Sequence, residues 1–201
     1  MDVFVPFDPR DPNTRLSSVL SADQRRAFAD AMLTDVLDAI DAAGHEPRIL
    51  STADLDRSRS VVVDNRPLTE AVNGVLDSMT LPVAVVMADL PLVTPETIDR
   101  LLGADGEVVL APGLGGGTNA FCSRHPEFRV DYHDGSYRKH RRQAEASDLI
   151  VNTVDSFRLA VDIDERADLA EVLLHGTGTA ADWLDDEGFE LVTSGGRCTV
   201  R

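Results

Sequence analysis

Three acidic residues stand where a metal ion could bind. Asp89 directly follows the apolar run 82–88, and the segment VDID places Asp162 and Asp164 two residues apart. Residues with this spacing on an extended segment point to the same side, so both carboxylates could join Asp89 around one ion. Mg²⁺ takes one or two carboxylates together with phosphate oxygens and water. Position alone leaves alternatives open, because Asp89 could cap a turn and Asp164 could cap a helix beginning near residue 165.

Two glycine-containing segments could bind a phosphate group. The glycine run 115–117 allows backbone N–H groups to approach an anion, and Thr118 and Asn119 add side-chain donors. In the second segment, Gly135 and Ser136 open a predicted helix, whose free N–H groups and macrodipole favour an anion. Neither segment carries the P-loop or the dinucleotide-binding fingerprint. If neither segment binds an anion, the first is explained as a flexible hairpin and the second as a basic helix that forms salt bridges with neighbouring acids.

Arginine side chains in the N-terminal region could contact a nucleotide. The segment PFDPRDPNTRL follows the first predicted strand and includes Arg10 and Arg15. Guanidinium groups bind phosphate through two parallel hydrogen bonds, so this loop could cover a nucleoside triphosphate. A second basic cluster, YRKHRR at 137–142, is the one concentrated positive segment of an acidic chain.

Alternating strands and helices must position these residues. Short apolar runs predict strands, and an apolar period of 3.6 residues predicts helices. A capping box of Ser21 and Gln24 opens the first helix, which Gly44 closes. The predicted strands are 3–5, 47–51, 60–64, 82–88, 107–111, 118–123, 149–154, 158–161 and 189–193. The later helices are predicted at 68–78, from Pro95 onward, and at 136–146, 165–174 and 180–187.

This alternation predicts a single α/β domain over residues 1–201 with a mostly parallel central sheet, because parallel strands need helical crossovers. The chain contains no repeat, low-complexity tract or linker that would divide it. Residues 194–201 are expected to form a flexible tail. Ligands of such sheets bind beyond the carboxyl ends of the strands, which is where Asp89 falls.

The charge of the chain excludes a general nucleic-acid binder. Among 201 residues, 19 are Lys or Arg and 35 are Asp or Glu, so the net charge is −16. A surface of this sign repels phosphate backbones. No apolar run approaches the roughly 18 residues of a membrane span, and no secretory signal opens the chain, so we expect a cytoplasmic protein without membrane contact. Cys122 and Cys198 are too few for a zinc site or a disulfide framework.

The same composition suggests a halophilic host. Only Lys139 is a lysine, whereas 18 residues are arginine. High-GC codon usage explains part of this bias. Self-repulsion of −16 charges destabilises a compact fold in dilute buffer, and molar salt screens that repulsion.

Taken together, the motifs resemble the 2-phospho-L-lactate guanylyltransferase family, archaeal enzymes of coenzyme F-420 biosynthesis. The likeness runs from about residue 3 to residue 174. It rests on VPFDPRDPNTRLSSVLS, AFADAMLTDVL, ADLPLVTPETID, GLGGGTNAF, DGSYRKHRRQAEA and VDIDERADLAEVL. The resemblance implies a Rossmann-like nucleotidyltransferase domain related to the GT-A glycosyltransferases, and it suggests a homodimer.

The resemblance also implies a reaction and its site. The phosphate of (2S)-2-phospholactate would attack the α-phosphorus of GTP in the presence of Mg²⁺, which gives lactyl-2-diphospho-5′-guanosine and pyrophosphate. By their match to family motifs, the implied catalytic residues are Asp89 and Asp162, and the implied metal ligands are Asp89, Asp162 and Asp164. Contacts to the acceptor phosphate fall on Gly117, Thr118, Gly135 and Ser136, and contacts to the nucleotide fall on Pro6, Phe7, Arg10, Arg15 and Ala88.

Two positions depart from the family pattern. Asn13 stands where members commonly have a lysine before the TRL triplet, and Thr69 stands where they often carry asparagine. If the lysine is missing, Arg10 or Arg15 must serve the triphosphate, and arginine does not replace lysine like for like. Two alternatives stay open. One is a related nucleotidyltransferase that uses phosphoenolpyruvate or a molybdenum-cofactor acceptor, and the other is a catalytically silent nucleotide-binding protein.

Overall fold

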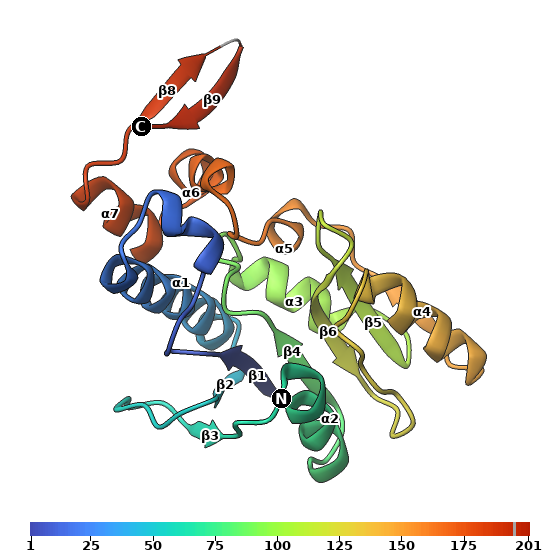
Figure 1. Ribbon diagram of the computed structural model, residues 1–201. Coiled ribbons are helices and arrows are strands. Elements are labelled where there is room, and N and C mark those ends of the chain that lie inside the picture. The colour runs from blue at the N-terminus through green and yellow to red at the C-terminus, as the bar shows by residue number, and fades with distance from the viewer. Residues whose placement is uncertain (195) are drawn as a thin grey trace.

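The computed structural model describes residues 1–194 and 196–201, and its centre is a mixed seven-stranded sheet with helices on both faces (Figure 1). The strand order is β3-β2-β1-β4-β6-β5-β7. β6 runs antiparallel to both of its neighbours, and the other pairs are parallel. The strands are β1 Asp2–Phe7, β2 Glu46–Ser51, β3 Val61–Val63, β4 Val83–Val86, β5 Val108–Pro112, β6 Thr118–Ser123 and β7 Val151–Thr153. The predicted α/β class with a mostly parallel sheet is confirmed.

Helices cover both faces of this sheet. Val3 and Val5 of β1 pack with α1 and α3 on one face, whereas Phe4 packs with α2 and α4 on the other. This alternation follows from the two-residue period of a strand. The helices are α1 Ala22–Ala42, α2 Leu68–Ser78, α3 Pro95–Gly103, α4 Ser136–Ala146, α5 Phe157–Ala160, α6 Leu169–His175 and α7 Thr179–Asp186, with short 3₁₀ turns η1 Thr14–Ser18 and η2 Arg166–Asp168.

The start of α1 confirms the predicted capping box. The Gln24 backbone N–H donates to Ser21 Oγ at 3.2 Å, and the Ser21 backbone N–H donates to Gln24 Oε1 at 2.9 Å. After the helix, Gly44 adopts φ 77°, a conformation that glycine reaches without a steric penalty. The helix therefore begins and ends where its sequence signals stand.

The predicted strand at 158–161 is wrong. The structure places α5, Phe157–Ala160, over most of that segment, with Leu159 and Ala160 buried. Periodicity alone does not separate a strand from a helical turn in a segment of only four residues. Only Val161, at φ −92° and ψ 96°, begins the extended segment that carries Asp162.

A hairpin occupies most of the segment 194–201, which the sequence predicts to be a flexible tail. β8 Leu191–Ser194 pairs antiparallel with β9 Arg197–Val200, so the expected strand 189–193 belongs to this hairpin and not to the central sheet. The hairpin lies at one end of the molecule beside α6 and α7 (Figure 1). Val200 is 3% exposed, and Arg166 Nη2 donates to its carbonyl at 2.9 Å. Within the described residues, every helix is too short or too polar to cross a bilayer.

Candidate functional site

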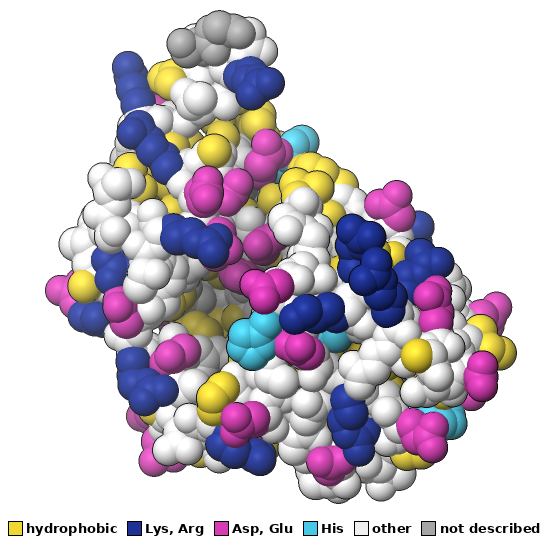
Figure 2. Space-filling model, turned by 45° about the vertical axis from the view of Figure 1, so that its right-hand side comes forward, with side chains coloured by type: hydrophobic (Ala, Val, Ile, Leu, Met, Phe, Trp, Pro, Cys, Tyr) yellow, Lys and Arg dark blue, Asp and Glu magenta, His cyan; other side chains and the backbone are white. Residues whose placement is uncertain are grey.

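A cavity of about 540 Å³ opens at the carboxyl ends of four parallel strands. Phe7 ends β1, Thr52 follows β2, Asp64 follows β3, and Asp89 lies three residues beyond β4. The predicted site residues in its wall are Pro6, Phe7, Arg10, Ala88, Asp89 and Asp164. Figure 2 shows a hollow in this region of the surface with acidic, basic and histidine side chains around it. The cavity thus lies where a sheet of this type binds its ligands.

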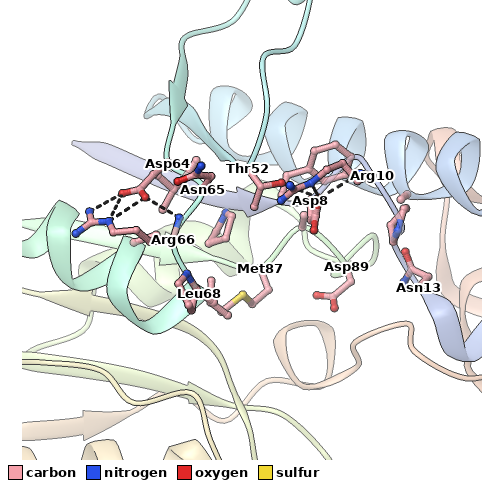
Figure 3. A pocket seen from close by; sticks show the side chains of 18 of the residues that line it. Asp8, Arg10, Asn13, Thr52, Asp64, Asn65, Arg66, Leu68, Met87 and Asp89 are labelled. Carbon is pink, nitrogen blue, oxygen red and sulfur yellow. Dashed lines mark hydrogen bonds and ion pairs between the residues drawn. The ribbon is translucent and has the colours of Figure 1, made fainter.

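Asp89 lies between Met87 and Asn13 in the wall of this cavity (Figure 3). Its Oδ1 atom is inaccessible to solvent, and none of the described residues offers it a hydrogen bond. Burial, followed by the charges of Asp162 and Asp164, raises the pKa of Asp89 to about 7. A buried carboxylate without a partner is costly unless a proton or a cation compensates it. The unpartnered oxygen of Asp89 therefore fits a divalent cation as one carboxylate ligand.

The other two acids are held by different partners. The Asn119 side-chain amide donates to Asp162 Oδ1 at 3.2 Å, and Arg15 Nη1 donates to Asp164 Oδ2 at 2.8 Å. Burial raises the pKa of Asp164, although Arg15 opposes that shift. Across the described residues, no three His, Cys, Asp or Glu side chains are arranged to hold a metal ion. Joint binding of one metal ion by Asp89, Asp162 and Asp164 consequently stays a prediction. It would require Arg15 to release Asp164.

A backbone contact holds the VDID segment beside Asp89. The Ile163 N–H donates to the Asp89 carbonyl oxygen at 3.0 Å, and Asn13 donates through its side chain to the Ile163 carbonyl at 2.9 Å. Asn13 therefore ties the N-terminal loop to the acidic segment. Arg15, a predicted nucleotide contact, does not line the described cavity and instead pairs with Asp164.

The structure brings the two glycine-containing segments together. The Thr118 N–H donates to Ser136 Oγ at 2.9 Å, and the Tyr137 N–H donates to the Gly116 carbonyl at 3.3 Å. Gly135 turns the chain into α4 with φ 69°. Thr118 and Ser136 are 3% and 4% exposed, whereas the adjacent glycines Gly117 and Gly135 are more accessible. The four residues predicted to contact the acceptor phosphate are thus neighbours in space.

These two segments reach the acidic residues because β6 is antiparallel. An antiparallel strand begins at the edge where its parallel neighbours end. Asn119, the second residue of β6, donates through its side chain to Asp162, and its carbonyl accepts from the Met87 N–H at 2.9 Å. Asn119 therefore joins the phosphate-binding candidates to the metal-binding candidates.

Several residues of the site were missed by sequence reasoning. Asp8 accepts hydrogen bonds from Arg10 and Thr52, which fixes the loop after β1, and Asp64 pairs with Arg66 at the far side of the cavity (Figure 3). Asp8 lies three residues after the predicted strand 3–5 and Asp64 ends the predicted strand 60–64, so each of the two acids carries a weak signal. Asn119 was expected to donate to an anion, but its bond to Asp162 carries no sequence signal. The contacts of the buried His140 carry none either, since its partners are distant in sequence.

The comparison with known families agrees with this geometry. Residues 1–198 match the family model described as guanylyl transferase CofC like. The chain belongs to this guanylyl transferase family. It is 59% identical over 200 residues to a 2-phospho-L-lactate guanylyltransferase of Halomicrobium mukohataei, and this covers 100% of the chain and 98% of that protein. It is 58% identical over 204 residues to the protein of the same name in Haloarcula marismortui, with the same coverage.

Solved structures of low sequence identity share the fold of this CofC-like chain. A structure from Desulfovibrio desulfuricans G20 has a TM-score of 0.78 at 14% identity, and the match covers 92% of this chain and 94% of that one. A nucleotidyl transferase from Methanothermobacter has a TM-score of 0.59 at 15% identity, and the match covers 87% of this chain and 97% of that one. A 2-C-methyl-D-erythritol 4-phosphate cytidylyltransferase from Thermus thermophilus has a TM-score of 0.53 at 15% identity. That match covers 87% of this chain and 96% of the cytidylyltransferase. The nucleotidyltransferase fold implied by the sequence motifs is confirmed.

Proposed function

We propose that this chain transfers the guanylyl group of GTP to the phosphate of (2S)-2-phospholactate. The observation that carries the proposal is the unpartnered carboxylate of Asp89, in the wall of the cavity formed by β1 to β4. The names of the relatives at 58% and 59% identity supply the substrates. A homodimer and a cytoplasmic location are also part of the proposal, and the resemblance of the sequence motifs supports the dimer.

The reaction needs no protein nucleophile. An oxygen of the acceptor phosphate forms a bond to the α-phosphorus of GTP, while the bond from that phosphorus to the bridging oxygen of pyrophosphate breaks. Because the acceptor is already an anion, the work of the protein is to align the two substrates and to offset their charge. In this proposal Pro6, Phe7, Arg10 and Ala88 contact the nucleotide, and Arg15 reaches the triphosphate after it leaves Asp164.

The acceptor phosphate would bind at the glycine-containing segments, on the side of Asp162 opposite to the nucleotide. Gly117 and Gly135 lie beside the buried hydroxyls of Thr118 and Ser136, and α4 begins at Ser136. The first N–H groups of a helix favour an anion. A hydrogen bond from the Asn119 side chain links this half of the site to Asp162.

Mg²⁺ is the proposed metal, and Asp89, Asp162 and Asp164 are the residues that would hold it. A divalent cation would supply charge neutralisation at the α-phosphate and at the leaving pyrophosphate. One solved structure of the same fold, from Mycobacterium tuberculosis, is a complex with manganese and has a TM-score of 0.50 at 17% identity. The support within this chain is the raised pKa of Asp89, to about 7, in a site shared with two more carboxylates.

Pyrophosphate release tests the proposal directly. The protein is assayed in concentrated KCl with Mg²⁺, with each nucleoside triphosphate in turn, and with phospholactate or phosphoenolpyruvate as acceptor. Release with GTP and phospholactate alone would support the proposed substrates. Release with another pair would keep the mechanism and reassign the acceptor or the base. Binding of GTP to folded protein without release from any pair would contradict an enzymatic role.

Replacing Asp89 by asparagine should separate activity from stability. Asp89→Asn keeps the shape of the side chain but removes the charge, so we expect turnover to fall by about a hundredfold or more. The melting temperature should stay equal or rise, because Oδ1 has no partner to lose within the described residues. The exposed Asp186→Asn is the matched control and should behave as wild type. Full activity of Asp89→Asn would remove this residue from the metal site.

A further inference from the structure

A buried histidine holds the two glycine-containing segments together. His140 lies on α4 and is 0% exposed. Its Nδ1 atom is 2.9 Å from Thr118 Oγ1, at the start of β6. Its Nε2 atom accepts a hydrogen bond from the Asp131 backbone N–H at 2.7 Å. One imidazole thus connects β6, α4 and the loop that precedes α4.

These contacts fix the tautomer of the ring. A backbone N–H can only donate, so Nε2 of His140 must be unprotonated and accept from the Asp131 N–H through its lone pair. Burial lowers the pKa of His140 to about 4, and the ring is therefore neutral near pH 7. A neutral imidazole has one N–H group, which must then lie on Nδ1. Nδ1 consequently donates to Thr118 Oγ1.

The tautomer determines where the hydroxyl protons can point. Thr118 Oγ1 accepts from His140, and Ser136 Oγ accepts from the Thr118 N–H at 2.9 Å. Each hydroxyl oxygen is thus engaged as an acceptor, and the Thr118 proton has no acceptor among the described residues. Ser136 Oγ donates to Thr118 Oγ1 at 3.4 Å, a long contact that a stronger acceptor can replace.

Aromatic packing keeps the ring in this orientation. Phe128 and Tyr132 contact the imidazole edge to face, with centroids 6.1 Å and 5.3 Å away and interplanar angles of 80° and 90°. Rotation of the ring about χ2 would break both hydrogen bonds within this packing. The packing therefore favours a single orientation of the His140 ring.

We propose that His140 is a positioning residue of the acceptor site, which holds the Thr118 hydroxyl so that its proton faces the acceptor phosphate. The inference rests on the proposed function and extends it to a residue that touches neither substrate. His140 acts through Thr118 and sets the direction of one hydrogen bond. It exchanges no proton during the reaction.

Two substitutions separate the two hydrogen bonds of the ring. In His140→Asn, the side-chain nitrogen can occupy the place of Nδ1, so the bond to Thr118 is kept and the acceptor for Asp131 is lost. In His140→Gln, the side-chain oxygen can reach the place of Nε2, so the acceptor for Asp131 is kept and the bond to Thr118 is lost. We expect His140→Gln to raise the KM for phospholactate about tenfold, with kcat and the KM for GTP within about twofold of wild type. His140→Asn should stay within about threefold in all three constants.

The companion variant Thr118→Val removes the hydroxyl itself. In this background His140→Gln should add no further increase to the KM for phospholactate, because the bond it breaks is already absent. Equal effects of His140→Asn and His140→Gln, or additive effects in the double variant, would overturn the proposal. His175→Gln, at the end of α6, is the control for loss of a histidine elsewhere.

Two measurements do not depend on turnover, and the first of them needs no variant. Nitrogen NMR of the ¹⁵N-labelled wild-type protein at pH 7 should show His140 protonated at Nδ1 and unprotonated at Nε2, and the opposite tautomer would overturn the proposal. Calorimetric titration with inorganic phosphate should give weaker binding to His140→Gln than to His140→Asn, and equal binding would overturn it. If wild type turns over no acceptor, the proposed function fails, while these two measurements still decide the role of His140.

Discussion

The protonation of His140 is coupled to the stability of the folded chain. An unfolded histidine takes up a proton near its ordinary pKa of 6.5, whereas burial holds the folded ring neutral until about pH 4. Between these values the unfolded chain binds more protons, so the free energy of unfolding falls as the pH falls from 6.5 to 4. Below pH 4 this group causes no further loss. The full effect is on the order of 3 kcal/mol.

Denaturant unfolding at constant high KCl measures this effect. We expect the free energy of unfolding of the wild type to decrease between pH 6.5 and pH 4, and that of His140→Asn to decrease less over the same interval. The difference between the two proteins isolates His140 from the carboxylates that titrate in the same range. Parallel curves for the two proteins would contradict a buried, neutral His140.

The position of a single residue was predictable where one strong local signal marked it. Asp89 follows the most apolar run of the chain, and the structure places it in the cavity wall beyond β4. The contact of Asn119 with Asp162 was not predictable, because the two residues are 43 positions apart in the sequence. The tautomer of His140 likewise depends on three segments that meet only in the folded structure. Chemical type and order in the chain do not encode such distances.

Among the elements, the helices with clear boundary signals were predicted best. The bounds of α2 and α4 agree with the predicted ranges 68–78 and 136–146. The antiparallel direction of β6 was not predictable from its apolar run, because a run of this kind fits either direction. The strand predicted at 158–161 was wrong for a related reason, since a segment of four residues carries too little periodicity.

The loop between β5 and β6 offers a test of how elements position Asp162. A methyl group on Gly113 would lie 2.4 Å from Asn119 Oδ1 and 2.8 Å from Asn119 Cγ, so the buried Asn119 side chain would have to move. That movement would break its hydrogen bond to Asp162. We expect Gly113→Ala to reduce turnover by roughly tenfold to a hundredfold, as misplaced catalytic groups do.

Gly103→Ala, at the end of α3, is the matched control for this test. A methyl group at this position would meet no other atom within 4 Å, and the φ of Gly103 lies outside the left-handed region. Turnover of Gly103→Ala should therefore stay close to that of wild type in the same pyrophosphate assay. Equal losses in both variants would contradict a specific role of the Asn119–Asp162 contact.

At the scale of the whole molecule, net charge controls the conditions under which the protein is stable. The chain carries −16 charges, and its relatives of highest identity named above come from haloarchaea. The Debye length falls from about 10 Å at 0.1 M salt to about 3 Å at 1 M, so concentrated KCl removes most of the repulsion between surface carboxylates. Stability should increase accordingly.

Thermal unfolding across a KCl series checks this expectation. The melting temperature should rise by about 10 °C or more between about 0.1 M and about 3 M KCl. Sucrose of equal osmolality is the control, because it favours compact states without screening charge. A melting temperature that does not rise with KCl would contradict adaptation to high salt.

The antiparallel strand β6 has a consequence for how enzymes of this kind diverge. The cavity wall comes mainly from β1, β2, β3 and β4 with the segments that follow them, whereas the glycine-containing segments come from β5, β6 and α4. The two groups meet across the boundary between β4 and β6. Asn119 links the two groups, and the other residues of each group come from separate segments of the chain. A lineage that keeps Asn119 could therefore inherit the proposed nucleotide pocket unchanged while selection reshapes the partner molecule it accepts.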